Sequence, residues 1–189
     1  LSRQEVMQMM QTPPSTIYLI GFMGSGKSTV GRALADALGY DFIDTDTFVE
    51  TRFHQRIVDM FASVGEATFR RRERLALEEL AGMERTVLAT GGGLPCYEDS
   101  IELLLETGLV IYFRSSPEAL AKRLELCKRT RPSIRDKSGE ELLAFIRETL
   151  ALREPIYSRA QIIRDIDHIT TREGEITFAH ELADELRAL

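Results

Sequence analysis

The chain is poor in the residues that build disulfide scaffolds and metal sites. It has two cysteines and three histidines among its 189 residues. Cys96 and Cys127 are too few and too isolated to cross-link a small fold or to form a metal-binding cluster. The histidines have no cysteine or carboxylate neighbours at the spacing of metal ligands. We therefore expect reduced cysteines that are structurally incidental, and histidines that lie on the surface or in packing contacts.

Long apolar runs are also absent. No stretch approaches the 18 consecutive apolar residues of a membrane-spanning helix, and the first residues lack the apolar run of a secretory signal. The formal net charge of −6 argues against nucleic acid or an anionic membrane as a partner. We expect a cytoplasmic protein that binds neither, in which any phosphate chemistry depends on a local concentration of positive charge.

The length and the apolar content are those of one globular domain. A chain of 189 residues that is 43% hydrophobic can form a single core. We expect one domain over residues 16–189. Residues 1–15, which contain methionines and glutamines and end near Pro13 and Pro14, are expected to form a short amphipathic or frayed extension.

Residues 21–29 read Gly-Phe-Met-Gly-Ser-Gly-Lys-Ser-Thr and match the phosphate-loop pattern G-x-x-x-x-G-K-[ST] at every position. Because glycines lack a Cβ, successive backbone N–H groups can turn inward around phosphate oxygens. Lys27 would reach the β- and γ-phosphates, and the Ser28 hydroxyl would face Mg²⁺. The alternative is a chance glycine-rich turn before a helix, but the apolar run before the loop and the helical spacing after it favour a nucleotide site. The predicted nucleotide-binding residues of the loop are Gly24, Ser25, Gly26, Lys27, Ser28 and Thr29.

Segments with the patterns of strands and helices alternate along the chain, which predicts a parallel sheet covered by helices on both faces. The expected strands cover residues 16–20, 41–44, 86–90, 109–113 and 161–164. The expected helices cover residues 27–38, 46–53, 57–63, 67–81, 99–106, 117–127, 139–153 and 175–188. Ligands of such sheets bind beyond the carboxyl ends of the strands, so the residues after each strand are the candidate site.

Two carboxylates, Asp44 and Asp46, follow the second expected strand. Their proximity is unfavourable unless a cation or a proton lies between them. One could face Mg²⁺ while the other approaches a substrate hydroxyl. The alternative is that Asp caps the helix that follows.

Further along, residues 65–74 form a strongly charged helical segment in which Phe69, Arg70 and Glu73 share one face. Glu73 would hold the Arg70 guanidinium ready for a carboxylate, although an arginine-rich helix is more often a solvated face. The triple glycine Gly91-Gly92-Gly93 after the third strand allows a ligand to approach the backbone closely, unless it is only a flexible turn.

The chain becomes basic over residues 123–137, and Pro132 breaks the helical pattern there. A basic flap over about 126–138 fits a lid that closes over polyphosphate and brings in an arginine; a solvated loop is the alternative. After it, Pro155 is expected to end the last central helix near Arg153, because the residue before a proline disfavours the helical conformation.

Together these motifs, in this order, resemble the shikimate kinase family, a nucleoside-monophosphate-kinase-like group of phosphate-loop proteins. The resemblance covers about residues 17–167 and includes Gly-Glu-x-x-Phe-Arg at 65–70, Arg-Pro at 131–132 and Arg-x-Pro-x-Tyr at 153–157. The pair of Asp-Thr-Asp and triple glycine would not be expected in the runner-up families, gluconate and adenylate kinases. A nucleotide-binding scaffold without activity would be expected to lack Lys27, Asp46 or Arg131, and all three are present.

The resemblance implies a three-layer α/β/α fold with a five-stranded parallel sheet of order 2-3-1-4-5. It also implies a monomer that uses ATP and Mg²⁺ to phosphorylate the 3-hydroxyl of shikimate. About residues 45–75 would form the acceptor-binding segment, and about 126–138 the lid.

Residue by residue, the resemblance implies that Arg70 and Arg153 hold the carboxylate of shikimate. Asp46 and the Gly92 backbone would hold its hydroxyl groups, and Phe61 and Phe69 would wall its ring.

On the donor side, the resemblance implies that Asp46 deprotonates the attacking hydroxyl and that Asp44 contacts Mg²⁺ through water. Lys27 and Arg131 would neutralise the transferring phosphoryl group, and Arg123 would stack on adenine. Where the family lid usually continues Arg-Pro-Leu, this chain has Ser133, so the motif does not predict the lid's apolar contact. The loop after Arg164 has no pattern that assigns adenine contacts.

Overall fold

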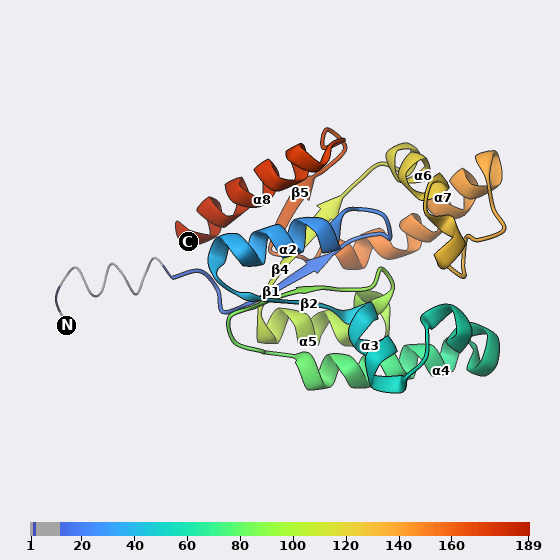
Figure 1. The fold of residues 1–189 in the computed structure, drawn as a ribbon, viewed down its shortest axis with the longest axis horizontal. Helices are drawn as coiled ribbons and strands as arrows, with labels where there is room; N and C mark the ends of the chain where they lie inside the picture. The colour runs from blue at the N-terminus through green and yellow to red at the C-terminus, as the bar shows by residue number, and fades with distance from the viewer. Residues whose placement is uncertain (1, 3–11) are drawn as a thin grey trace.

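The sheet at the centre of the molecule has the predicted strand order. The structure, a computed structural model, describes residues 2 and 12–189. Five parallel strands are arranged in the order β2-β3-β1-β4-β5 (Figure 1). The strands are β1 Thr16–Ile20, β2 Asp41–Asp44, β3 Thr86–Ala89, β4 Leu109–Arg114 and β5 Ile162–Asp165. The α/β expectation is confirmed, with strand ends shifted by at most one residue.

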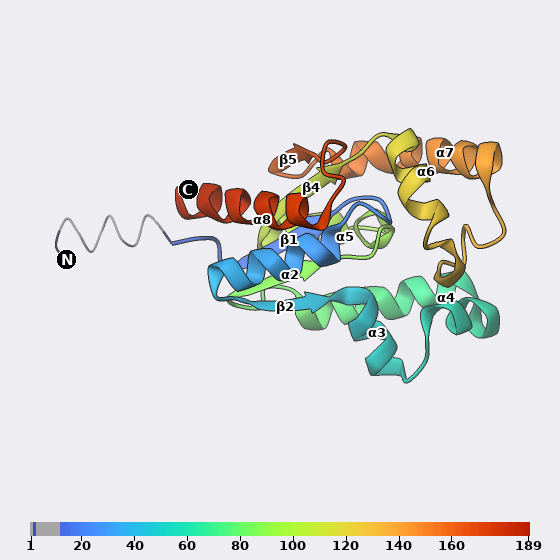
Figure 2. The same cartoon turned by 45° about the horizontal axis from the view of Figure 1, so that its top comes forward.

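Helices cover both faces of this sheet (Figure 2). They are α2 Lys27–Leu38, α3 Thr45–Phe53, α4 Ile57–Leu80, α5 Ser100–Thr107, α6 Pro117–Glu125, α7 Gly139–Tyr157 and α8 Arg172–Arg187, with short 3₁₀ turns at Leu94–Cys96 and Lys128–Thr130. Side chains of a strand alternate between the faces. Ile17 and Leu19 of β1 therefore pack in the core beneath α2 and α8, whereas Tyr18 and Ile20 pack in the core formed with α4, α5 and α7.

The chain just before β1 is attached to the sheet. The backbone N–H of Thr86 donates to the Ser15 carbonyl at 2.9 Å, and the Tyr40 hydroxyl donates to the Pro13 carbonyl at 3.1 Å. Residues 1 and 3–11 of the expected N-terminal extension lie outside the described residues. Within the described part of the chain, no helix has the length and apolar character needed to cross a membrane.

The expected break between helices over 57–63 and 67–81 is confirmed: α4 consists of two helices that meet at Gly65, whose φ of 80° and ψ of 168° are not helical. One helix differs from expectation. The prediction that α7 ends near Arg153 is wrong, because α7 continues through Pro155 to Tyr157. Proline removes one helical hydrogen bond, to the carbonyl four residues earlier. That carbonyl belongs to Ala151, which is exposed to water.

Candidate functional site

The phosphate loop connects β1 to α2 and has the backbone conformation that its glycines permit. Gly24 and Gly26 have φ values of 80° and 82°, a region that residues with a Cβ rarely adopt. A Cβ on Gly24 would lie 2.9 Å from Leu124 Cδ2, so the loop packs directly against α6. The loop therefore presents backbone N–H groups and the N-terminus of α2 at one end of the sheet.

Lys27 lies buried under this loop. Its ammonium group donates to the carbonyls of Gly21 and Phe22, each at 2.8 Å, and lies 3.3 Å from Ser25 Oγ. Burial and then the nearby Arg131 guanidinium lower the pKa of Lys27 from 10.5 to about 7, against the opposing effects of the Asp46 and Asp44 carboxylates. A bound anion would favour the protonated form of this lysine.

Asp44 caps the helix that follows, which is the alternative role expected from the sequence, and it also accepts a hydrogen bond from Ser28. Its Oδ1 caps α3 by accepting from the backbone N–H groups of Asp46 at 2.9 Å and Thr47 at 3.3 Å. Its Oδ2 accepts from the Ser28 hydroxyl at 2.5 Å. Among the described residues, no group of three or more His, Cys, Asp or Glu side chains could hold a metal ion. A Mg²⁺ beside Ser28 and Asp44 would therefore take most of its ligands from phosphate oxygens and water.

Asp46 is the second residue of α3 and faces the triple glycine. The two segments meet because Asp44 pairs with Ala89 where β2 and β3 end, and the Gly91 N–H donates to Thr45 Oγ1 at 3.0 Å. A Cβ on Gly91 would lie 2.6 Å from Asp46 Oδ1, so only glycine allows this approach. Burial and then the Asp44 carboxylate raise the pKa of Asp46 from 3.8 to about 6, against the opposing effects of Lys27 and Arg131.

Two cavities meet at these residues. The first, the phosphate-loop cavity, has a volume of about 860 Å³ and includes the loop from Gly24 to Thr29, except the buried Ser25. The second, the arginine cavity, has a volume of about 480 Å³ and opens between α3, α4, the triple glycine and residues 129–133. The residues that line both cavities are Met23, Asp46, Gly91, Gly92 and Arg131.

The arginine cavity brings together all the residues predicted to bind the acceptor. These are Asp46, Phe61, Phe69, Arg70, Glu73, Gly91, Gly92, Gly93 and Arg153. Arg70 donates to Glu73 Oε1 at 2.8 Å, as the helix spacing predicted. A Cβ on Gly93 would lie 2.4 Å from Arg70 Nη2, so the guanidinium lies directly on the glycine backbone. Burial raises the pKa of Glu73 from 4.5 to about 7, although Arg70 acts in the opposite direction.

Aromatic rings form one wall of this cavity. The ring centroids of Phe61 and Phe69 lie 5.0 Å apart at an interplanar angle of 45°. Phe69 is buried in the small cluster that joins α3 to α4. The cavity therefore offers an apolar wall opposite charged groups, which suits a ring that carries polar substituents.

Two guanidinium nitrogens of arginines that line the cavities are buried without a hydrogen-bond partner among the described residues. They are Arg131 Nε and Arg153 Nη1. Such buried donors are rare, because leaving them unpaired is costly. Arg131 belongs to the segment between α6 and α7, which is held by Ile134, a fully buried residue of the main core. Ile134 thus supplies the apolar contact that the Arg-Pro-Ser sequence left unpredicted.

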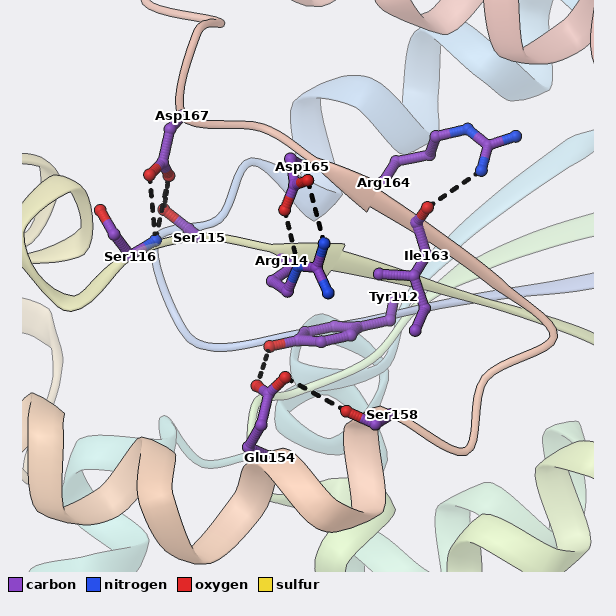
Figure 3. A network of polar contacts seen from close by, with 10 residues as sticks. All are labelled: Tyr112, Arg114, Ser115, Ser116, Glu154, Ser158, Ile163, Arg164, Asp165 and Asp167. Carbon is purple, nitrogen blue, oxygen red and sulfur yellow. Dashed lines mark hydrogen bonds and ion pairs between the residues drawn. The ribbon is translucent and has the colours of Figure 1, made fainter.

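Arg123 lines the phosphate-loop cavity and ties three segments together. It donates to the carbonyls of Gly24 at 3.4 Å, Ile166 at 3.2 Å and Ile169 at 2.5 Å. Beside it, the Asp167 carboxylate accepts from Ser115 Oγ at 2.6 Å and from the Ser116 N–H at the start of α6 (Figure 3). The loop after β5 is therefore fixed against α6.

Motif reasoning missed several residues that line the cavities. In the arginine cavity these are Met23, Glu50, Arg56, Ile57, Val58, Arg129, Pro132 and Ser133. In the phosphate-loop cavity they include Lys122, Leu126, Cys127, Asp167, Ile169, Thr170 and Glu175. Among these residues, only those that lie within the basic segment 123–137 were indicated by any feature of the sequence. The loop after β5 has no local pattern, because its position depends on Arg123 and Asp167.

Comparisons with known proteins agree with this geometry. The family profile described as shikimate kinase matches residues 23–187. A shikimate kinase of Parabacteroides distasonis is 44% identical over 170 residues, which cover 90% of this chain and 96% of that protein. The crystal structure of shikimate kinase from Bacteroides thetaiotaomicron superimposes with a TM-score of 0.85 at 39% identity, over 93% of this chain and 99% of that one. A shikimate kinase from Acinetobacter baumannii, solved in complex with shikimate, has a TM-score of 0.78 at 34% identity, over 94% and 93% of the two chains. The chain belongs to the shikimate kinase family.

Proposed function

We propose that this chain transfers the γ-phosphoryl group of ATP to the 3-hydroxyl group of shikimate, in the biosynthesis of chorismate and the aromatic amino acids. The observation that carries the proposal is that Asp46 and Arg131 line both cavities. A group that accepts a proton and a group that stabilises negative charge therefore lie where donor and acceptor meet. Family membership supports the same reaction.

The phosphate-loop cavity would hold the donor. The loop from Gly24 to Thr29 would surround the phosphates with N–H groups, and Arg123 would stack on adenine. Ser28 and, through water, Asp44 would hold Mg²⁺. When bound, this ion would neutralise charge on the phosphate oxygens and align the transferring group.

The arginine cavity would hold the acceptor. Arg153 and Arg70, the latter held by Glu73, would bind the carboxylate of shikimate. Asp46 and the backbone of Gly92 would hold its hydroxyl groups. Phe61 and Phe69 would cover the ring, and Gly91 and Gly93 leave room for its close approach.

In the reaction, the acceptor oxygen bonds to the γ-phosphorus as the bond to the β–γ bridging oxygen of ATP breaks. Asp46 accepts the proton of the hydroxyl, and ADP leaves with the bridging oxygen. Lys27 and Arg131 stabilise the charge on the transferring group, and closure of the lid excludes water that would otherwise hydrolyse ATP.

We further propose that residues 16–189 form one domain that acts as a cytoplasmic monomer, with about residues 45–75 binding the acceptor and about 126–138 acting as the lid. Apart from ATP, shikimate would be its only partner, and the net charge of −6 disfavours nucleic acid and anionic membranes.

A coupled assay of ADP release with Mg²⁺-ATP tests the reaction against shikimate, gluconate and nucleoside monophosphates. We expect turnover with shikimate alone. A Lys27→Met variant purified in parallel controls for contaminating kinases and should be inactive. Turnover with gluconate or a nucleoside monophosphate, and none with shikimate, would contradict the proposal.

A further inference from the structure

Tyr157 is a buried tyrosine that lies behind the arginine cavity without lining it. It is the last residue of the Arg-x-Pro-x-Tyr motif, and none of the roles described above involves it. Its hydroxyl donates to the Gly92 carbonyl at 2.5 Å. The side chain therefore reaches from α7 to the strand-end glycines, which come 65 residues earlier in the chain.

The continuation of α7 through Pro155 places Tyr157 beside Arg153. Residues four positions apart lie on the same face of a helix. Burial raises the pKa of the Tyr157 hydroxyl, and the Arg153 guanidinium offsets part of that rise, so the hydroxyl remains a donor at neutral pH. A Cβ on Gly92 would lie 3.2 Å from Arg153 Nη1. Tyr157, Arg153 and Gly92 thus form one cluster.

The ring of Tyr157 is itself held from the side of the sheet. Its centroid lies 5.0 Å from that of Tyr112 on β4. The Tyr112 hydroxyl donates to Glu154 Oε2 at 2.5 Å, and Glu154 Oε1 accepts from Ser158 Oγ at 3.1 Å (Figure 3). The last turn of α7 is therefore attached to β4, and the Tyr157 hydroxyl has a defined position.

We propose that Tyr157 is a positioning residue that orients the peptide group between Gly92 and Gly93, next to Arg153, toward the acceptor. This inference rests on the proposed function, in which the Gly92 backbone and Arg153 bind shikimate. A glycine has no side chain that restricts its rotation, so the hydrogen bond to Tyr157 determines the direction of its carbonyl. Because a peptide group is planar, that bond also turns the N–H of Gly93 away from Tyr157.

Tyr157→Phe removes only the hydroxyl and retains the ring. Tyr18→Phe is the matched control, because it removes the hydroxyl of another fully buried tyrosine of the same core, whose hydroxyl bonds with Thr107 Oγ1 and accepts from the Gly82 N–H rather than contacting Gly92. Both variants are assayed below the lower of their two unfolding temperatures. We expect Tyr157→Phe to raise KM for shikimate about tenfold or more, with KM for ATP changed by less than about twofold. Tyr18→Phe should lower the unfolding temperature to a similar extent and leave both KM values near those of the wild type.

Equal KM values for shikimate in the two variants would overturn the positioning role. So would a Tyr157→Phe chain that fails to fold while Tyr18→Phe folds, because Tyr157 would then be a structural residue. Failure of the proposed function is a separate result: the wild type itself would not turn over shikimate.

Discussion

Asp46 has the environment of a proton acceptor. Its carboxylate is held against Gly91, and burial together with Asp44 raises its pKa to about 6. A base is more effective when its pKa approaches the working pH, provided that it remains ionised there. Asp44, by contrast, is occupied by the start of α3 and by Ser28. The two carboxylates of the Asp-Thr-Asp motif therefore have different tasks.

Asp46→Asn should lower kcat for shikimate by about 10²- to 10⁴-fold, because an amide cannot accept the proton. The loop that holds ATP is unchanged, so the Kd for ATP measured by titration calorimetry should change little. A kcat near the wild-type value would contradict the assignment of Asp46 as the base.

Glu73 should make stability depend on pH. Its pKa is about 7 in the folded protein and 4.5 for an ordinary glutamate, so between these pH values the folded state binds more protons than the unfolded state. The free energy of unfolding therefore falls as the pH rises from 4.5 to about 7, by up to about 3 kcal/mol from this group.

Glu73→Gln has no such titration, so its free energy of unfolding, measured by urea denaturation, should decline less over that range than that of the wild type. Glu66→Gln makes the same change at an exposed side chain of α4 and should keep the wild-type pH dependence. Parallel pH profiles for wild type and Glu73→Gln would refute the predicted effect.

At the scale of elements, α2 shows why a glycine can be required inside a helix. A Cβ on Gly31 would lie 2.7 Å from Phe42 Cε2 and 3.1 Å from Leu19 Cδ1. Phe42 packs against the core beneath α2 and α8, and the Arg32 guanidinium lies 4.7 Å from its ring centroid, so a movement of the ring would disturb both contacts. The close packing of α2 on the sheet thus depends on this glycine.

Gly31→Ala should lower the free energy of unfolding by about 1 kcal/mol, and by no more than about 2 kcal/mol. Alanine gains about 1 kcal/mol in helix propensity, but overpacking typically costs about 1 to 3 kcal/mol. Asp36→Ala, on the exposed face of α2, should cause no loss. Urea denaturation of both variants checks this, and a stabilised Gly31→Ala would show that Phe42 moves without strain.

At the scale of the whole molecule, the charge distribution opposes the net charge. The chain carries −6 overall, yet five arginines line the arginine cavity, namely Arg56, Arg70, Arg129, Arg131 and Arg153. A concentration of one sign of charge around a cleft attracts ligands of the opposite sign over distances of about a Debye length. Association of an anionic acceptor should therefore weaken as salt is added.

At low ionic strength, Arg129→Gln should lower kcat/KM for shikimate about threefold. The variant's kcat/KM should also depend less on salt concentration than that of the wild type. Arg135→Gln removes the same charge from the same lid at an exposed position that lines neither cavity, and it should change neither quantity. Initial rates over a series of salt concentrations measure both. Identical salt profiles for the two variants would mean that only the total charge matters.

Most of the fold was predictable because strand and helix patterns are local. The strands were predicted to within one residue, and the ordered motifs pointed to the family. The prediction failed at Pro155, where local preference favours a helix end but burial of Tyr157 and the bond from Tyr112 to Glu154 hold the last turn. The prediction was also incomplete for residues 126–138, where Ile134 makes an apolar contact with the main core that the motif did not indicate.

Local patterns and the order of the motifs account for the phosphate loop, for the carboxylates and glycines at the strand ends and, through the family resemblance, for the order of the strands. The packing of the helices on the sheet, by contrast, brings Asp46 and Arg131 between the two cavities, lets Arg123 fix the loop after β5 and brings Tyr157 to Gly92. These contacts join residues far apart in the chain, and they form only when the helices pack on the twisted sheet. No local pattern encodes that packing.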